Sequence, residues 1–336
     1  MLPSPKELKA QLPLTEPLRK SIASFRLRAK EIFCGKDPSI ALMLGPCSIH
    51  NRDAALEYAH KLHALSKEVN DRFFVVMRTY VEKSRTGNDW KGFLHDPDLS
   101  GQPNVEMGLR RTRELFLELT TLGIPTASEF VDPLAALYYE DLVTWGFIGA
   151  RTCSSQPHRQ FASSLPFPIG IKNDLQGNVA HAVYGVSVAN APQTMLFPNE
   201  DGRLDLLCTA GNPHAHIVLR GSEQEPNGTP HEIEKALALL KNVGLPSKVM
   251  VDCSHGNSQK RPLKQRDVFQ TTLAYWEKNP DAFLGVMIES YFEEGSQAIS
   301  PYAHPYLSVT DPCLDWNTTR EMILQAYSAW MSSIRS

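Results

Sequence analysis

Eight short, mostly apolar runs recur along the chain, and a charged or metal-binding side chain follows each of them. Segments long enough for helices fill most of the intervals between the runs. This alternation is typical of parallel sheets, and eight repeats predict a (β/α)8 TIM barrel with its chemistry at the C-terminal strand ends. The runs are residues 41–44, 73–77, 126–128, 147–150, 168–171, 216–219, 248–251 and 284–288.

The remaining segments predict helices and two additions to the barrel. Residues 1–38 contain two helical patterns, over 5–12 and 18–33, which predicts an N-terminal arm before a catalytic barrel over 39–336. Residues 193–210 alternate around a turn sequence and indicate a β-hairpin inserted before the sixth barrel strand. The loop over 79–104 is long enough to be functional. Other helices are expected over residues 53–69, 106–121, 133–144, 155–164, 178–189, 230–241, 263–278 and 318–333.

Composition and charge exclude several classes of protein. The formal net charge of the 336 residues is −3, so the chain lacks the strongly basic character that nucleic-acid binding requires. No stretch resembles a signal peptide or approaches the length of a membrane span. The six cysteines are scattered without C-x-x-C spacing, which indicates reduced thiols. We therefore expect a cytoplasmic enzyme with neither a membrane nor a nucleic acid as partner.

Six cationic side chains fall at the ends of the runs or in the loops that follow. They would repel one another at one rim unless anions neutralise them, and arginine binds phosphate or carboxylate through paired hydrogen bonds. Neither G-x-x-x-x-G-K-[ST] nor G-x-G-x-x-G occurs, which argues against nucleotides. We therefore expect small phosphorylated or carboxylated substrates. The cations are Arg78, Lys83, Arg85, Arg151, Lys172 and Arg220.

Four further residues are candidates to hold a metal at the same rim. Cys47, His255 and Glu289 follow predicted strands, and Asp311 closes the last loop. A thiolate, an imidazole and two carboxylates suit Mn2+, Fe2+, Co2+ or Zn2+, whereas Ca2+ prefers oxygen ligands. No local spacing motif supports the four, so their convergence depends on the barrel. A buried thiol and a hydrogen-bonded histidine without a metal are the alternative interpretation.

Glu129 and Lys172 are titratable groups expected within the cationic rim. Nearby positive charge keeps a carboxylate ionised and disfavours a charged amine. Glu129 could therefore orient a water molecule, and Lys172 could donate a proton. A Schiff-base lysine is a second interpretation of Lys172, although a metal offers a different way to activate a carbonyl group.

Short motifs surround these residues from about Lys6 to Ala329, nearly the whole chain. They are Gly45-Pro46-Cys47-Ser48-Ile49-His50, Met77-Arg78-Thr79-Tyr80 with Glu82-Lys83-Ser84-Arg85-Thr86, Ile148-Gly149-Ala150-Arg151-Thr152, Ser155-Gln156-Pro157-His158-Arg159, Gly170-Ile171-Lys172-Asn173, Leu219-Arg220-Gly221, Ser254-His255-Gly256-Asn257-Ser258 and Met287-Ile288-Glu289-Ser290. Together, in this order, they resemble the class I 3-deoxy-D-arabino-heptulosonate 7-phosphate (DAHP) synthases, which open the shikimate pathway to the aromatic amino acids.

This resemblance implies a metal-dependent transferase, dimeric or tetrameric, that condenses phosphoenolpyruvate with D-erythrose 4-phosphate. It implies one divalent metal per subunit, with Mn2+ the first expectation, held by Cys47, His255, Glu289 and Asp311. It implies a phosphoenolpyruvate site built from Arg78, Lys83, Glu129, Arg151, Lys172 and Arg220. Arg85 and Thr86 would hold the phosphate of the aldose. The catalytic residues that it implies are Lys83, Glu129, Lys172 and His255.

Two departures from the family pattern concern the substrate loop and regulation. Ser84 stands where the family has proline, which frees one backbone φ angle beside Arg85. Feedback-inhibited members bind an aromatic amino acid away from the active site, and Pro166 stands where they carry a small residue. Pro133, Leu137 and Phe197 also give that region an apolar character. The resemblance therefore implies an aromatic amino acid effector with weakened or altered control.

Two other functions stay open. The same scaffold supports a sister reaction, the synthesis of 3-deoxy-octulosonate 8-phosphate from arabinose 5-phosphate. Arg85, Thr86 and the inserted hairpin favour the shorter sugar. The chain could also be a non-catalytic paralogue that binds phosphoenolpyruvate or an aromatic amino acid as a regulator. The filled metal and phosphate positions favour catalysis.

Overall fold

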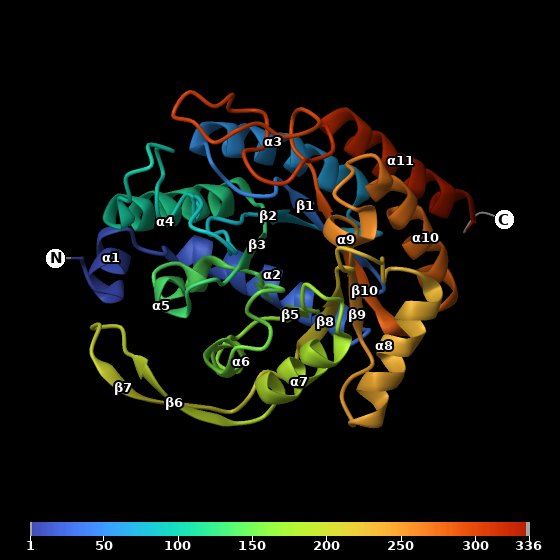
Figure 1. Cartoon of the computed structure of the whole chain (residues 1–336), viewed down its shortest axis with the longest axis horizontal. Coiled ribbons are helices and arrows are strands. Elements are labelled where there is room, and N and C mark those ends of the chain that lie inside the picture. The colour runs from blue at the N-terminus through green and yellow to red at the C-terminus, as the bar shows by residue number, and fades with distance from the viewer. Residues whose placement is uncertain (1, 334–336) are drawn as a thin grey trace.

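The computed structural model describes residues 2–333, and within them eight parallel strands close into a barrel surrounded by helices (Figure 1). Neighbouring strands follow the order β1-β10-β9-β8-β5-β4-β3-β2, and β1 pairs with β2 to close the ring. This arrangement confirms the predicted TIM barrel. The strands are β1 (Ile40–Gly45), β2 (Phe73–Arg78), β3 (Thr126–Glu129), β4 (Trp145–Ile148), β5 (Ile169–Lys172), β8 (Ala215–Leu219), β9 (Val249–Asp252) and β10 (Phe283–Glu289).

The parallel register is what brings the strand ends to one rim. Every residue of the eight strands is buried, because helices cover the outside of the barrel and side chains fill its inside. Leu44 of β1 lies opposite Met77 of β2, and Gly45 lies opposite Glu289 of β10. Residues that immediately follow neighbouring strands therefore emerge side by side.

The helices begin at residues whose side chains cap the first turn. Asn51, Asn104, Asn178 and Thr229 each accept a hydrogen bond from a backbone N–H at the start of a helix, which satisfies a donor that the helix leaves free. The helices after β1 are α3 (Arg52–Val69), α4 (Val105–Leu122), α5 (Pro133–Ala136), η1 (Glu140–Leu142), α6 (Gln156–Ala162), α7 (Val179–Asn190), α8 (Pro230–Asn242), α9 (His255–Ser258), α10 (Lys264–Lys278), η2 (Pro280–Ala282) and α11 (Trp316–Ser333).

One predicted helix is wrong, and one strand is shifted. Residues 133–144 form the single turn α5 and the short η1 instead of one helix. The backbone N–H groups of Leu142 and Val143 donate to carbonyls three residues back, which is the pattern of a 3-10 turn. Arg113 also donates to the carbonyl of Tyr138, and Arg26 donates to the carbonyls of residues 140 and 143. β4 covers Trp145–Ile148 instead of 147–150, so Arg151 lies in the loop beyond the strand.

The N-terminal helices α1 (Pro5–Gln11) and α2 (Glu16–Phe33) precede the barrel, and α2 crosses one end of it (Figure 1). Ala29, Ile32 and Phe33 of α2 are buried in one cluster with interior barrel residues such as Met43 and Trp145. α2 therefore closes the end of the barrel opposite the C-terminal strand ends.

The predicted hairpin is present as β6 (Gln193–Pro198) and β7 (Leu204–Thr209), an antiparallel pair separate from the barrel. It reaches past α6 toward α1 in Figure 1. The Lys6 backbone N–H donates to the carbonyl of Glu200 at 2.9 Å, and Lys6 Nζ lies 2.9 Å from Asp201 Oδ1. These contacts tie the tip of the hairpin to α1. No helix within residues 2–333 is long and apolar enough to cross a membrane.

His216 of β8 is a buried histidine near the closed end of the barrel, and its surroundings suit the neutral ring. Trp145 Nε1 donates a hydrogen bond to His216 Nε2 at 3.3 Å, and His216 Nδ1 lies 3.2 Å from the carbonyl oxygen of His214. A proton added at Nε2 would face the indole N–H. Burial lowers the pKa of His216 to about 4.

We expect this histidine to destabilise the protein in mild acid. Between about pH 6.5 and pH 4 the unfolded chain binds the proton while the folded protein does not, so the free energy of unfolding falls by on the order of 3 kcal/mol. Above about pH 6.5 the effect is absent. Urea unfolding at several pH values gives the free energy of unfolding of wild type and His216→Gln. Below about pH 6.5 this free energy should fall less steeply for the variant than for wild type. Identical pH slopes would contradict the assignment.

Candidate active site and metal centre

The rim at the C-terminal strand ends brings together the four residues predicted as metal ligands. Cys47 Sγ and carboxylate oxygens of Glu289 and Asp311 all lie within 4.8 Å of one another. His255 Nε2 lies 3.5 Å from Glu289 Oε1 and 3.9 Å from Asp311 Oδ2. One sulfur, one imidazole nitrogen and two carboxylate oxygens at these separations fit the donor set of a single divalent transition metal.

Cys47 is surrounded by hydrogen-bond donors that suit a thiolate. Lys83 Nζ lies 3.1 Å from Cys47 Sγ, and the backbone N–H of Asp311 donates to the same sulfur at 3.3 Å. Burial, with the neighbouring Glu289 carboxylate, raises the pKa of the Cys47 thiol to about 11. A metal ligand must lose this proton, so metal binding and deprotonation of Cys47 would be coupled.

Glu289 is held in place from both of its oxygens. Arg78 Nη2 lies 3.0 Å from Glu289 Oε1, and Ser254 Oγ donates to Glu289 Oε2 at 2.7 Å. Burial opposes the charged carboxylate, but electrostatic interactions with His255 and Arg78 keep the pKa of Glu289 below its usual value. Arg78 itself is fully buried beneath the rim. The structure thus places Arg78 behind a metal-ligand candidate. Arg78 does not line the cavity that opens beside these candidates.

Asp252, the last residue of β9, is a site residue that the sequence reasoning missed. Lys172 Nζ donates to Asp252 Oδ2 at 2.8 Å, and His255 Nδ1 lies 2.9 Å from the same oxygen. Burial opposes its charge, yet His255 and Lys172 hold the pKa of Asp252 well below its usual range. The sequence did contain a sign of this role, because Asp252 is a carboxylate at the end of the apolar run of β9. Asp252 joins the metal-ligand candidate His255 to the cation Lys172.

A cavity of about 200 Å³ opens beside the four metal-ligand candidates. Among the described residues, its lining contains six cations and three carboxylates, so it carries an excess of positive charge that suits an anionic ligand. Lys260, which pairs with Asp311 at 2.9 Å, and Asp89 were not predicted. We call this space the strand-end cavity; it is lined by Lys83, Ser84, Arg85, Thr86, Asp89, Glu129, Ala150, Arg151, Lys172, Arg220, His255, Lys260 and Asp311.

Three local features shape the lining of the strand-end cavity. A Cβ atom on Gly149 would lie 2.2 Å from Glu129 Oε1, so a larger residue at this position would displace the Glu129 carboxylate from its present place. Arg151 Nε donates to Thr86 Oγ1 at 2.9 Å, which links the loop after β4 to the loop after β2. Burial lowers the pKa of Arg220, which donates to the carbonyl of Gly221 at 3.2 Å.

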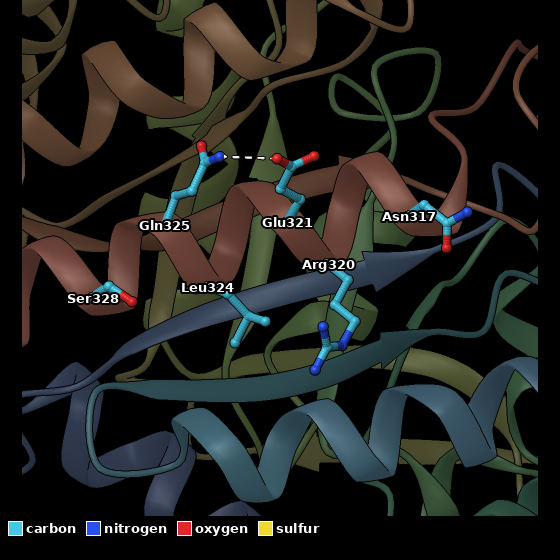
Figure 2. A pocket seen from close by; sticks show the side chains of 6 residues that line it. All are labelled: Asn317, Arg320, Glu321, Leu324, Gln325 and Ser328. Atoms are coloured by element: carbon cyan, nitrogen blue, oxygen red, sulfur yellow. Dashed lines mark hydrogen bonds between the residues drawn. The ribbon is translucent and has the colours of Figure 1, made fainter.

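A second depression lies on the outer face of α11, away from the strand ends (Figure 2). Its residues come from one helix, and Figure 2 shows Gln325 donating to Glu321, at 3.2 Å. Arg320 there pairs with Glu68 at 3.0 Å. Exposed pairs of this kind are ordinary surface contacts. The strand-end cavity is therefore the candidate active site.

We expect Asp252→Asn to weaken metal binding, because asparagine keeps the shape of aspartate but removes the charge that orients His255. Losing such an outer partner typically costs roughly ten- to a hundredfold in metal affinity. Calorimetric titration of Mn2+ into metal-free protein should show this loss. Asp205→Asn, an exposed change on the hairpin, serves as the control. Equal affinities in all three proteins would contradict the role assigned to Asp252.

Comparison with known proteins identifies the family. Residues 17–324 match the DAHP synthetase I family. The chain is 40% identical over 335 residues to the Trp-sensitive phospho-2-dehydro-3-deoxyheptonate aldolase of Salmonella typhi, covering 99% of this chain and 95% of the relative. It is 39% identical over 330 residues to the Tyr-sensitive enzyme of Escherichia coli, covering 97% and 92%. A solved phospho-2-dehydro-3-deoxyheptonate aldolase from Francisella tularensis superposes with a TM-score of 0.95 at 39% identity, covering 98% and 96%. The family expected from the motifs is confirmed: the chain belongs to the DAHP synthetase I family.

Proposed function

We propose that this chain is a DAHP synthase that condenses phosphoenolpyruvate with D-erythrose 4-phosphate and water, giving 3-deoxy-D-arabino-heptulosonate 7-phosphate and inorganic phosphate. The observation that carries the proposal is one cationic cavity that opens directly beside four convergent metal-ligand candidates. The names of the relatives support this product. Two anionic substrates would neutralise the excess positive charge of the strand-end cavity.

The reaction forms one carbon–carbon bond and one carbon–oxygen bond, the latter from water, and breaks the carbon–oxygen bond to the phosphate. C3 of phosphoenolpyruvate attacks the aldehyde carbon of the aldose, and positive charge develops at C2. Water adds at C2, and the resulting hemiketal phosphate then loses inorganic phosphate by C–O cleavage. A divalent metal held by Cys47, His255, Glu289 and Asp311 supplies Lewis-acid polarisation of the aldehyde when bound.

The phosphoenolpyruvate site that we propose lies between β4, β5 and β8. Arg151, Lys172 and Arg220 line the cavity there and would hold the phosphate and carboxylate groups. The hydrogen bond from Lys172 to Asp252, at 2.8 Å, fixes the ammonium group at the cavity wall. Much of the catalysis would then come from positioning, since both reacting carbons are held at one rim.

Glu129 and Lys83 have separate proposed roles at the reacting end. The Glu129 carboxylate would orient the attacking water and accept its proton. Lys83 reaches the sulfur of Cys47 at 3.1 Å and also lines the cavity, so it touches both the metal centre and the substrate space. Its pKa is raised, because the surrounding Cys47, Glu289 and Asp311 outweigh the effect of burial. Lys83 therefore stays protonated, and we propose that its ammonium group donates a hydrogen bond to the oxygen that becomes a hydroxyl group.

Arg85 and Thr86, in the loop after β2, would hold the phosphate of the aldose. We further propose Mn2+ as the metal, with Fe2+, Co2+ and Zn2+ as alternatives that suit the same donors. A homodimer or homotetramer is supported by Leu196, Leu204 and Leu206, which are exposed on the hairpin.

Phosphate release from phosphoenolpyruvate tests the reaction. With Mn2+ we expect turnover with erythrose 4-phosphate, and a kcat/KM at least about tenfold lower with arabinose 5-phosphate, which carries one more carbon. Preference for arabinose 5-phosphate would favour the octulosonate reaction. A metal-loaded protein that releases no phosphate would favour the non-catalytic paralogue. Adding Phe, Tyr or Trp to the same assay tests for an effector, and strong inhibition by any of them would refute weakened feedback control.

Cys47→Ala removes the sulfur donor and should abolish metal-dependent turnover, with a loss of roughly a hundredfold or more. Metal analysis of the purified variant should show the metal lost along with the activity. Cys153→Ala is the matched control, because this thiol is also buried but is not among the metal-ligand candidates. Near-normal activity and metal content in Cys47→Ala would refute the ligand assignment.

A further inference from the structure

The loop that carries Arg85 and Thr86 also brings a carboxylate of its own to the strand-end cavity. Asp89 lines the cavity, and its Oδ2 lies 3.3 Å from Arg85 Nη2. The other two carboxylates of the lining are engaged elsewhere. Asp311 lies among the metal-ligand candidates and pairs with Lys260, while Glu129 packs against Gly149. Asp89 therefore faces the guanidinium group that we assign to the aldose phosphate.

The geometry of the loop fixes its base and leaves its tip exposed. The backbone N–H of Lys83 donates to the carbonyl of Lys91 at 2.9 Å, and that of Leu94 donates to the carbonyl of Val81 at 3.0 Å. Gly92 closes this base with a φ of +111°, where a Cβ atom would lie 2.4 Å from the carbonyl oxygen of Val81. Residues 86–89 are exposed. The tip can therefore exchange partners while the base stays in place.

We propose that the Asp89 carboxylate competes with the phosphate group of the aldose for the guanidinium group of Arg85. Without substrate, the Asp89 carboxylate satisfies the guanidinium group of Arg85. A sugar phosphate must displace this carboxylate to form its own paired hydrogen bonds with Arg85. A phosphate dianion attracts Arg85 more strongly than a carboxylate monoanion does. A phosphorylated aldose can therefore displace Asp89, whereas an aldose without a phosphate group cannot, and the pair favours phosphorylated aldoses. The inference rests on the proposed function, which assigns Arg85 to the aldose phosphate.

The burial of the pair sets the size of the expected effect. The side chains of Arg85 and Asp89 are 28% and 56% exposed. Solvent screens an ion pair of this kind, so releasing Arg85 should improve phosphate binding by roughly two- to fivefold. Once displaced, the Asp89 carboxylate would still lie near the bound phosphate and repel it, and this repulsion acts in the same direction.

Steady-state kinetics of the Mn2+-loaded enzyme tests the proposal. We expect Asp89→Asn to lower the KM for erythrose 4-phosphate by roughly two- to fivefold, while the KM for phosphoenolpyruvate does not change. Asp89→Glu, which keeps the charge, should return the KM toward the wild-type value. Asp98→Asn is the matched control, because Asp98 pairs with Arg111 outside the strand-end cavity. In an Arg85→Ala background, Asp89→Asn should lower this KM by a smaller factor than in wild type, because only the repulsion of the phosphate is then removed.

The opposite results would overturn the proposal. An unchanged KM for erythrose 4-phosphate in Asp89→Asn would show that the carboxylate does not compete, and a raised KM would show that it helps to orient Arg85. Both outcomes leave DAHP synthase activity intact. If wild type releases no phosphate with erythrose 4-phosphate, the proposed function fails separately. Calorimetry with inorganic phosphate then decides the matter: tighter binding to Asp89→Asn supports competition, and equal binding refutes it.

Discussion

The site depends on a chain of buried charges that links four strand ends. Arg78 at the end of β2 pairs with Glu289 of β10, whose carboxylate lies 3.5 Å from His255 Nε2. His255 in turn lies 2.9 Å from Asp252, which accepts from Lys172 of β5. Charges withdrawn from water are costly unless partners of opposite sign surround them. Each buried group of this chain is therefore stabilised by its neighbours. Removing one group would leave the next as a buried charge without a partner, which would destabilise the folded protein.

This dependence explains why the barrel suits the chemistry. Its closed ring holds every strand between two others, so the ends of β5, β9 and β10 cannot drift apart without breaking the parallel register. Cys47 and Asp311 complete the group from the loops after β1 and β10. The buried strand ends thus carry Glu289 and Lys172, and the other metal-ligand candidates and the proposed phosphoenolpyruvate groups follow strands in the adjoining segments. The loop after β2, whose tip is exposed, carries Arg85 and Thr86, the groups assigned to the aldose phosphate.

Sequence patterns predicted the barrel and most of the lining of its cavity, because both follow from what occurs at a strand end. Strand patterns place Lys172 and Glu289 at such ends, and the closed parallel sheet brings them together whatever their separation along the chain. Asp252 was missed although it occupies the same kind of position, since pairing with Lys172 and His255 is visible only in space. Lys260 and Asp89 lie inside loops, where the path of the backbone is not set by periodicity. The segment expected as one helix over 133–144 forms two short turns, and Arg26 and Arg113, which contact its carbonyl groups, lie too far away in sequence for periodicity to reveal them.

The two substrates would meet very different parts of this protein. Phosphoenolpyruvate would meet a wall in which Lys172 and Arg220 are buried and Lys172 is fixed against Asp252, so these two side chains would lose little conformational entropy when it binds. The aldose phosphate would meet a partly exposed arginine paired with a carboxylate of the same loop. Ordering that loop and displacing its internal partner offset part of the attraction between Arg85 and a phosphate group. Such a site would hold phosphoenolpyruvate through preorganised cations and select the aldose phosphate through competition with Asp89. Both properties depend on where the strands end and the loop after β2 begins.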